Sequence, residues 1–139
     1  MTDSGHSYRF PKREKLVSKK DIEELFKNGS SFYLRPLLMK YKPTLSGDAH
    51  QTLFSVSKRN YKRAVDRNLI KRRMREAFRL NKHLIDKPDG AFYHIAFVYV
   101  EKTILPYDQI EPKLKKLIKR LNDQASKKGG NQKRNKQTT

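Results

Sequence analysis

The chain has 139 residues and no cysteine, and its 33 lysines and arginines against 14 acidic residues give a net charge of +19. The length predicts one domain with one modest core, and the lack of cysteine excludes disulfides and thiolate chemistry. Such a charge favours a nucleic acid as partner, with an anionic membrane surface as the weaker alternative. No stretch approaches the roughly 20 apolar residues of a membrane span, so we expect a soluble cytoplasmic protein with no membrane partner.

The N-terminal part of the chain predicts a disordered segment, a basic arm and a first helix. Residues 1–7 are small and polar, and we expect them to be disordered. Ser18 has the side chain and position of a helix cap, and Asn28 with Gly29 is typical of a helix end. A helix is therefore predicted between these residues.

Two strands are predicted next, over residues 37–42 and 51–58, with a weaker signal over 32–35. Both strands alternate between an apolar face and a more polar face. The polar face, with Lys40 and Ser55, is expected to remain open.

The second half of the chain predicts helix, strand and helix, completing the order αβββαβα. The helices are expected over about 62–84 and from between Pro106 and Pro112, with an apolar strand over 94–100 between them. The predicted domain covers residues 8–122. Residues 123–139, rich in Lys, Gly, Asn and Gln, predict a basic flexible tail.

The second helix carries the strongest functional signal. Between Lys58 and Arg79 the chain has ten basic residues and two acidic ones. Five of the basic residues recur at a spacing of four and predict a ridge along one helix flank, because residues four apart are neighbours on a helix. This cationic ridge consists of Arg63, Arg67, Lys71, Arg75 and Arg79. Like charges at this spacing oppose helix formation, which indicates a polyanionic partner rather than a merely solvated face.

Four aromatic residues lie in or near basic segments and are candidates for stacking on unpaired bases: Phe10, Phe26, Tyr33 and Tyr41. For Phe26 and Tyr41, a place in the core is an equal alternative.

The sequence holds no recognisable catalytic set. The acidic cluster of Asp21, Glu23 and Glu24 would be spread in different directions by a helix, and the four histidines lack metal-ligand spacing. We therefore predict neither a catalytic residue nor a metal site in the protein itself.

Two stretches resemble the protein component of bacterial ribonuclease P. Residues 54–58 read F-S-V-S-K, and residues 64–78 read A-V-D-R-N-L-I-K-R-R-M-R-E-A-F. The family's motif is S-V-S-K followed by A-V-x-R-N-R-x-K-R-x-x-R-x-A-F. Leu69 stands where the motif has its second arginine, and the segment between the two stretches is about one residue longer than in many members and lacks their usual glycine. The basic arm and first helix are also similar to the family, so the resemblance covers roughly residues 8–122.

The resemblance implies a two-layer α/β sandwich, of the α+β type, with one four-stranded sheet, three helices and a left-handed βαβ crossover. It also implies a function: the protein would bind the catalytic ribonuclease P RNA and the 5′ leader of precursor tRNA. The RNA would perform the hydrolysis with Mg²⁺ that it mainly holds itself, and the protein would bind no cofactor alone and act as a monomer in the holoenzyme.

Carried over by position, the motif assigns Arg67, Asn68, Lys71, Arg72 and Arg75 to the catalytic RNA. Charge alone adds Lys58, Arg59, Lys62, Arg63 and Arg79 to that interface. The resemblance places Phe26, Lys40 and Ser55 in a cleft that holds the leader.

Two other classes of function stay open at this point. One is a basic ribosomal protein or RNA chaperone with a structural role. The other, an autonomous nuclease, is disfavoured because the sequence offers no converging carboxylates.

Overall fold

The computed structural model describes residues 10–44, 49–86 and 92–137, with side chains described as far as Gln124. The predicted disordered segment 1–7 lies outside these residues. Helices and strands follow in the order η1 (Lys12–Glu14), α1 (Lys19–Asn28), β1 (Ser30–Leu34), β2 (Leu37–Thr44), β3 (Gln51–Val56), α2 (Ala64–Asn81), η2 (Lys82–Leu84), β4 (Phe92–Tyr99) and α3 (Tyr107–Gln137). This order confirms the predicted αβββαβα arrangement, including the weakly signalled first strand.

The four strands form one mixed sheet in the order β1-β2-β4-β3. Strand β2 is antiparallel to β1 and to β4, whereas β3 runs parallel to β4. The register aligns Met39, Phe97 and Phe54 across three strands on one face. Lys40 and Leu53 flank Ala96 in the same way on the other face, so the alternation read from the sequence corresponds to two real faces of the sheet.

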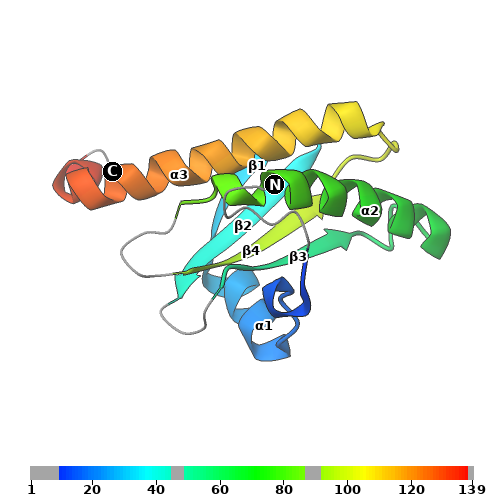
Figure 1. Ribbon diagram of the computed structural model, residues 1–139, viewed down its shortest axis with the longest axis horizontal. Helices are drawn as coiled ribbons and strands as arrows, with labels where there is room; N and C mark the ends of the chain where they lie inside the picture. Colours follow the sequence, from blue (N-terminus) through cyan, green and yellow to red (C-terminus); the bar gives the residue numbers. More distant parts are fainter. Residues whose placement is uncertain (1–9, 45–48, 87–91, 138–139) are drawn as a thin grey trace, which may run out of the picture.

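Helices α2 and α3 lie side by side over one face of the sheet, and α1 lies under the other (Figure 1). The main core fills the space between the sheet and the α2–α3 layer. Its fully buried members include Met39, Ile70, Met74, Ile95, Phe97, Leu114, Leu117 and Ile118. A smaller cluster of Leu16, Leu25 and Ala96 holds α1 against the other face.

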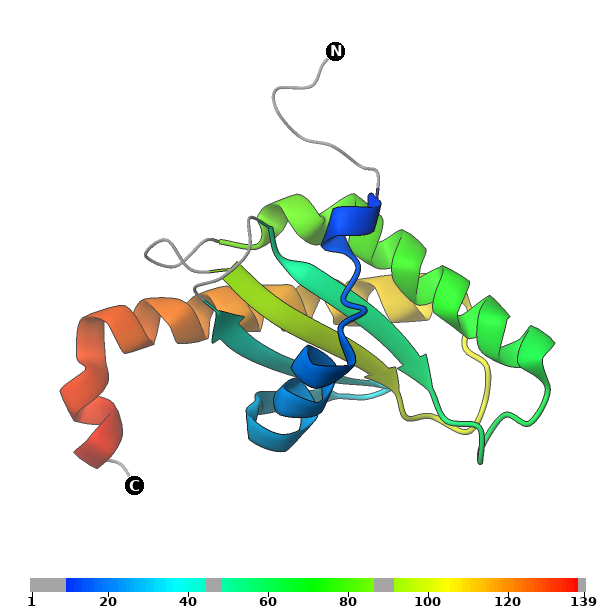
Figure 2. The same cartoon turned by 90° about the horizontal axis from the view of Figure 1, so that it is seen from below.

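The connection from β3 through α2 to β4 is left-handed. Figure 2 shows the sheet from the α1 side, so that α2 lies behind it. If this view is rotated so that the β3 and β4 arrows point upward, β4 lies to the right of β3. A connection that passes behind the sheet and leads to the strand on the right is left-handed. This exception to the strong preference for right-handed crossovers is what the resemblance implied.

The ends of α1 form as predicted. The Oγ of Ser18 accepts a hydrogen bond from the backbone N–H of Asp21 at 3.3 Å. Gly29 follows the helix, where a Cβ would lie 2.4 Å from the carbonyl oxygen of Leu25 and 3.0 Å from that of Tyr41. The φ of Gly29 is −76°, which any residue can adopt, so its backbone conformation does not require glycine. Glycine is needed here because the two carbonyl oxygens leave no room for a Cβ.

Helix α3 extends further than the sequence indicated. Its backbone continues to Gln137, through most of the segment that was expected to be a flexible tail from residue 123. The last buried side chain described on α3 is Leu121, so the apolar stripe ends near the predicted domain boundary although the helix does not. Flexibility of this segment stays a prediction.

Candidate nucleic-acid interface

The loop between β3 and α2 presents basic side chains on a compact turn. The Oγ of Ser57 accepts hydrogen bonds from the backbone N–H groups of Arg59 and Asn60, at 3.1 and 3.4 Å. Lys58, Arg59 and Lys62, which the sequence assigned to the interface, are all exposed. The loop therefore forms a closed turn without the glycine found in many family members.

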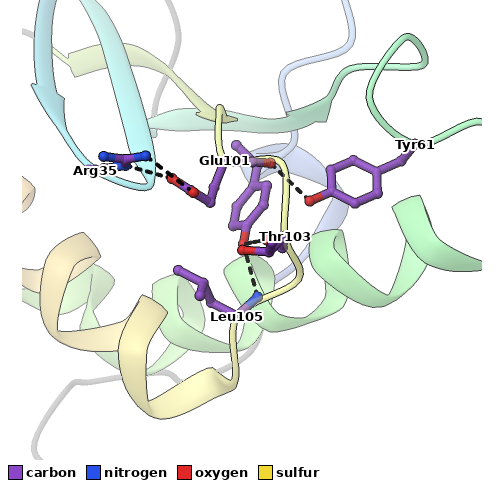
Figure 3. A network of polar contacts seen from close by, with 6 residues as sticks. Arg35, Tyr61, Glu101, Thr103 and Leu105 are labelled. Atoms are coloured by element: carbon purple, nitrogen blue, oxygen red, sulfur yellow. Dashed lines mark hydrogen bonds and ion pairs between the residues drawn. The ribbon is translucent and has the colours of Figure 1, made fainter.

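Tyr61 fixes this loop to the opposite connection of the fold. Its side chain is 7% exposed, and its hydroxyl donates a hydrogen bond to the carbonyl oxygen of Glu101 at 2.9 Å (Figure 3). The carboxylate of Glu101 in turn pairs with the guanidinium of Arg35 at 2.6 Å. The β3–α2 loop is thus connected to the β4–α3 connection and to the turn between β1 and β2.

A second tyrosine shapes the β4–α3 connection. The hydroxyl of Tyr99 donates to the carbonyl oxygen of Thr103 at 2.6 Å and accepts from the N–H of Leu105 at 3.0 Å (Figure 3). Burial raises the pKa of both Tyr61 and Tyr99 above the ordinary value, so both hydroxyls keep the proton that they donate.

Helix α2 presents the cationic ridge, but the five members of the ridge differ in their partners. Arg67 uses one nitrogen, Nη1, to donate hydrogen bonds to the carbonyl oxygens of Tyr61 and Lys62, at 2.7 and 2.9 Å. At the far end, Arg79 pairs with Glu76 at 2.6 Å. Arg63 lies 4.0 Å from the carboxylate of Asp66. The two ends of the ridge are therefore partly neutralised.

The two ridge members between Arg67 and Arg79, and the adjacent Arg72, are free. Within the described part of the chain, Lys71, Arg72 and Arg75 make no hydrogen bond or ion pair. Arg72 and Arg75 are exposed and Lys71 is half-buried. We call these three residues the free cations of α2. They are the side chains best placed to bind phosphates, because no intramolecular contact has to be broken first.

The neighbouring motif positions are also accessible. Asn68 is exposed, and Leu69, which stands at the position of the motif's second arginine, is half-buried. Arg73, which no sequence motif marked as different from its neighbours, donates to the carbonyl oxygen of Leu105 at 2.6 Å and so joins α2 to the β4–α3 connection. No local signal could have separated Arg73 from Arg72, because its partner is 32 residues away.

On the opposite side of the sheet, four half-buried side chains form an accessible surface, which we call the open sheet face: Leu38, Lys40, Ser55 and Val98. Ser55 is the register partner of Val98 on β4, and Val98 that of Leu38 on β2. Lys40 lies two residues along β2, and its ammonium donates to the Oγ of Ser31 at 2.9 Å. The sequence around Val98 does not indicate its place on this face, because β4 is apolar on both faces.

Helix α1, which carries Phe26, packs on this same side of the sheet. Leu25 packs against Ala96, the register partner of Lys40. Phe26 follows it in the chain and is 38% exposed. The structure therefore brings Phe26, Lys40 and Ser55 to one side of the sheet, with no direct contact between them among the interactions described.

The four candidate stacking aromatics divide into two groups. Tyr33 is 58% exposed and Phe26 is 38% exposed, so both can meet a base. Tyr41 is 8% exposed and stacks on Phe32 with ring centroids 5.1 Å apart. Phe10 packs edge-on against Phe54 and Phe78 at 5.8 and 5.9 Å. Tyr41 therefore belongs to the core, which is the alternative that the sequence left open for it, and the half-buried ring of Phe10 packs against that core.

The described residues offer no cage for a metal ion, since no group of three or more His, Cys, Asp or Glu side chains converges among them. Glu24, from the acidic cluster of α1, accepts a hydrogen bond from the side chain of Asn28 at 2.7 Å. In the same part of the chain, no helix has both the length and the apolar character needed to cross a membrane.

The fold and these two surfaces define a basic α+β protein of the RNA-binding type. The family model described as Ribonuclease P matches residues 10–122. The ribonuclease P protein component of Porphyromonas gingivalis is 32% identical over 126 residues, covering 85% of this chain and 90% of the relative. That of Thermotoga petrophila is 31% identical over 126 residues, covering 87% and 98%.

Solved structures agree with this match. The ribonuclease P protein from Thermotoga maritima superimposes with a TM-score of 0.65 at 26% identity, covering 77% of this chain and 96% of that one. The protein from Staphylococcus aureus gives a TM-score of 0.64 at 25% identity, covering 76% and 93%. The chain therefore belongs to the ribonuclease P family of protein components.

Proposed function

We propose that this chain, as the protein subunit of ribonuclease P, binds the catalytic RNA through α2 and the 5′ leader of precursor tRNA through the open sheet face. The complex would remove the leader endonucleolytically and leave the mature 5′ end of the tRNA. The observation that carries the proposal is the set of free cations on α2, at motif positions of a family whose members are ribonuclease P protein components.

The chemistry of the two surfaces supports this division of roles. Arginine guanidinium groups bind phosphates in a bidentate manner, which suits a surface that meets a folded RNA. The open sheet face combines apolar side chains, one ammonium group and the nearby ring of Phe26. Such a surface binds a single strand by stacking and backbone contacts, without reading its sequence.

We place the catalysis on the RNA subunit and not on protein side chains. The described residues contain no converging carboxylates for Mg²⁺, so the protein's part is to position the RNA and the substrate. A single copy of the protein in each holoenzyme is part of the proposal. The cytoplasmic location expected from the sequence stays a prediction.

The proposal is tested by mixing the full chain with a bacterial ribonuclease P RNA and precursor tRNA at a low Mg²⁺ concentration. We expect cleavage at the mature 5′ end that neither component gives alone under these conditions. Binding to ribosomal RNA without restored cleavage would instead support a structural RNA-binding role, which the family match does not favour. Cleavage by the protein in the absence of any RNA partner would overturn the assignment of catalysis to the RNA.

A further inference from the structure

A groove of about 520 Å³ lies on the α2–α3 layer, between η2 and α3. Three apolar side chains contribute to its wall: Leu84 from η2, and Pro112 and Ile118 from α3. Ile118 is fully buried, whereas Leu84 is 37% exposed. The groove therefore offers apolar surface within reach of a ligand.

Lysines surround this apolar surface. Lys115, Lys116 and Lys119 line the groove and are exposed. None of the three makes a hydrogen bond or ion pair within the described residues. The groove thus combines apolar contact area with three ammonium groups that make no ion pair among the described residues.

The other polar groups of the groove hold its shape. Glu111, the only acid among the described lining residues, accepts a hydrogen bond from the side chain of Asn81 at 2.7 Å. Asn122 accepts from the N–H of Asp86 at 2.9 Å and donates to the carbonyl oxygen of Leu84 at 2.7 Å. These contacts tie η2 to α3, so the groove is formed before any ligand arrives.

The groove shares no described lining residue with either surface of the proposed function. Helix α2 places Arg75, the last of the free cations, six residues before its end, or about 9 Å at 1.5 Å per residue. The basic loop precedes its first residue, whereas η2 follows its last. The open sheet face lies on the far side of the sheet, where α1 packs (Figure 2). Neither surface accounts for the lysines of the groove.

We infer that this groove binds a segment of ribonuclease P RNA. The lysine ammonium groups would contact successive phosphates, and an unpaired base would pack on the apolar side chains. The inference rests on the proposed function, and it selects the catalytic RNA because the groove belongs to the same helical layer as the free cations of α2. The precursor leader is assigned to the opposite face of the sheet.

The first test compares two charge-matched variants of the full chain. One carries Lys115→Gln and Lys119→Gln in the groove, and the control carries Lys19→Gln and Lys20→Gln, which remove two exposed and unpaired lysines from α1. We expect the groove variant to bind ribonuclease P RNA several-fold more weakly. For two lost phosphate contacts, the slope of log K against log salt should also decrease in magnitude by about 1.4 to 1.8. The control should change both quantities much less.

Equal losses in the two variants would overturn the inference, because they would report only the net charge. Unchanged RNA binding by the groove variant would also overturn it. If the groove variant lost affinity for precursor tRNA but not for the catalytic RNA, the choice of partner would be wrong.

The second test locates the partner directly. Because the chain has no cysteine, Lys116→Cys creates a unique site for a benzophenone label, and Lys20→Cys on α1 serves as the control. In the assembled holoenzyme, we expect the label at position 116 to crosslink to one segment of ribonuclease P RNA that the control does not reach. Crosslinks only to precursor tRNA, or none to RNA, would refute the inference.

The two proposals fail in different ways. If the unmodified chain does not restore cleavage, the proposed function itself fails. If the unmodified chain restores cleavage but the groove variant binds and crosslinks no differently from the control, only the groove assignment fails.

Discussion

The free cations of α2 and the open sheet face are both accessible surfaces of one small domain, but they differ in chemistry. Lys71, Arg72 and Arg75 have no partner within the described residues. The open sheet face has a single cation, Lys40, which is already held by the Oγ of Ser31 at 2.9 Å. A set of uncompensated charges acts over long range and is weakened by salt, whereas a largely apolar face acts only on contact. The two surfaces should therefore respond differently to salt and to substitution.

The largest expected effect comes from removing charge from the middle of α2. Lys71→Gln with Arg75→Gln should weaken binding to ribonuclease P RNA about tenfold or more and lower the slope of log K against log salt by about 1.4 to 1.8. The preference for precursors with a leader should persist. Filter binding at several salt concentrations measures both quantities, with Lys19→Gln and Lys20→Gln on α1 as the charge-matched control. A loss of leader preference in the α2 variant would show that the free cations of α2 also contribute to leader binding.

Phe26→Ala tests the other surface. Stacking of a base on an aromatic ring contributes about 1–3 kcal/mol, so the affinity for precursors with a leader should fall by about tenfold. Affinity for a precursor without a leader and for the catalytic RNA should not change. Equal losses for both precursors, measured with the holoenzyme in parallel titrations, would contradict the leader-binding role of Phe26.

Arg67→Ala tests the difference between an arginine that shapes the site and one that binds RNA directly. The two hydrogen bonds from Arg67 to the backbone carbonyls of Tyr61 and Lys62 would be lost, and we expect the free energy of unfolding to fall by about 1–2 kcal/mol. Arg75→Ala, which breaks no intramolecular contact among the described residues, should leave the free energy of unfolding within about 0.5 kcal/mol.

Urea unfolding of the two variants measures this difference. If Arg67→Ala were as stable as Arg75→Ala while losing RNA affinity, Arg67 would act only through direct contact with RNA. Loss of both stability and affinity would mean that the shape of the β3–α2 loop is part of the interface.

The smallest expected effect concerns His94, which lies on the α1 side of the sheet at the register position of Lys42. Burial lowers the pKa of His94 below its ordinary value of 6.5, the negative charge of Asp21 opposes this shift, and the positive charge of Lys42 adds to it. The unfolded chain therefore binds a proton more readily than the folded protein does. At a pH above the ordinary pKa, His94 is neutral in both states and does not destabilise the fold. As the pH falls from the ordinary pKa towards the lowered pKa of the folded state, protonation of the unfolded chain reduces the free energy of unfolding.

His94→Gln should accordingly make the free energy of unfolding less dependent on pH between 7.5 and 5.5. Urea unfolding at these two pH values checks the expectation. An unchanged pH dependence would show that other groups control it. The effect should be small because His94 is partly exposed.

Much of this molecule follows from local sequence patterns. The alternation of apolar residues in 37–42 and 51–58 determined which side chains face the core, and the spacing of four determined the ridge on α2. The helix cap at Ser18 and the end of α1 at Gly29 follow from short-range hydrogen bonding and packing. These features need only neighbours along the chain, so the sequence alone was sufficient to predict them.

Only the tertiary structure decided which basic side chains are free. Arg73 is held by Leu105, 32 residues away, and Tyr61 is anchored to Glu101, 40 residues away. A periodic pattern places a residue on a face, but it does not specify which distant carbonyl or carboxylate meets it there. For the same reason the sequence did not reveal that Phe10 packs against the core, or that a lysine-lined groove forms where η2 meets α3. For Tyr41 it left a core position and a stacking role equally open, and the structure decided for the core.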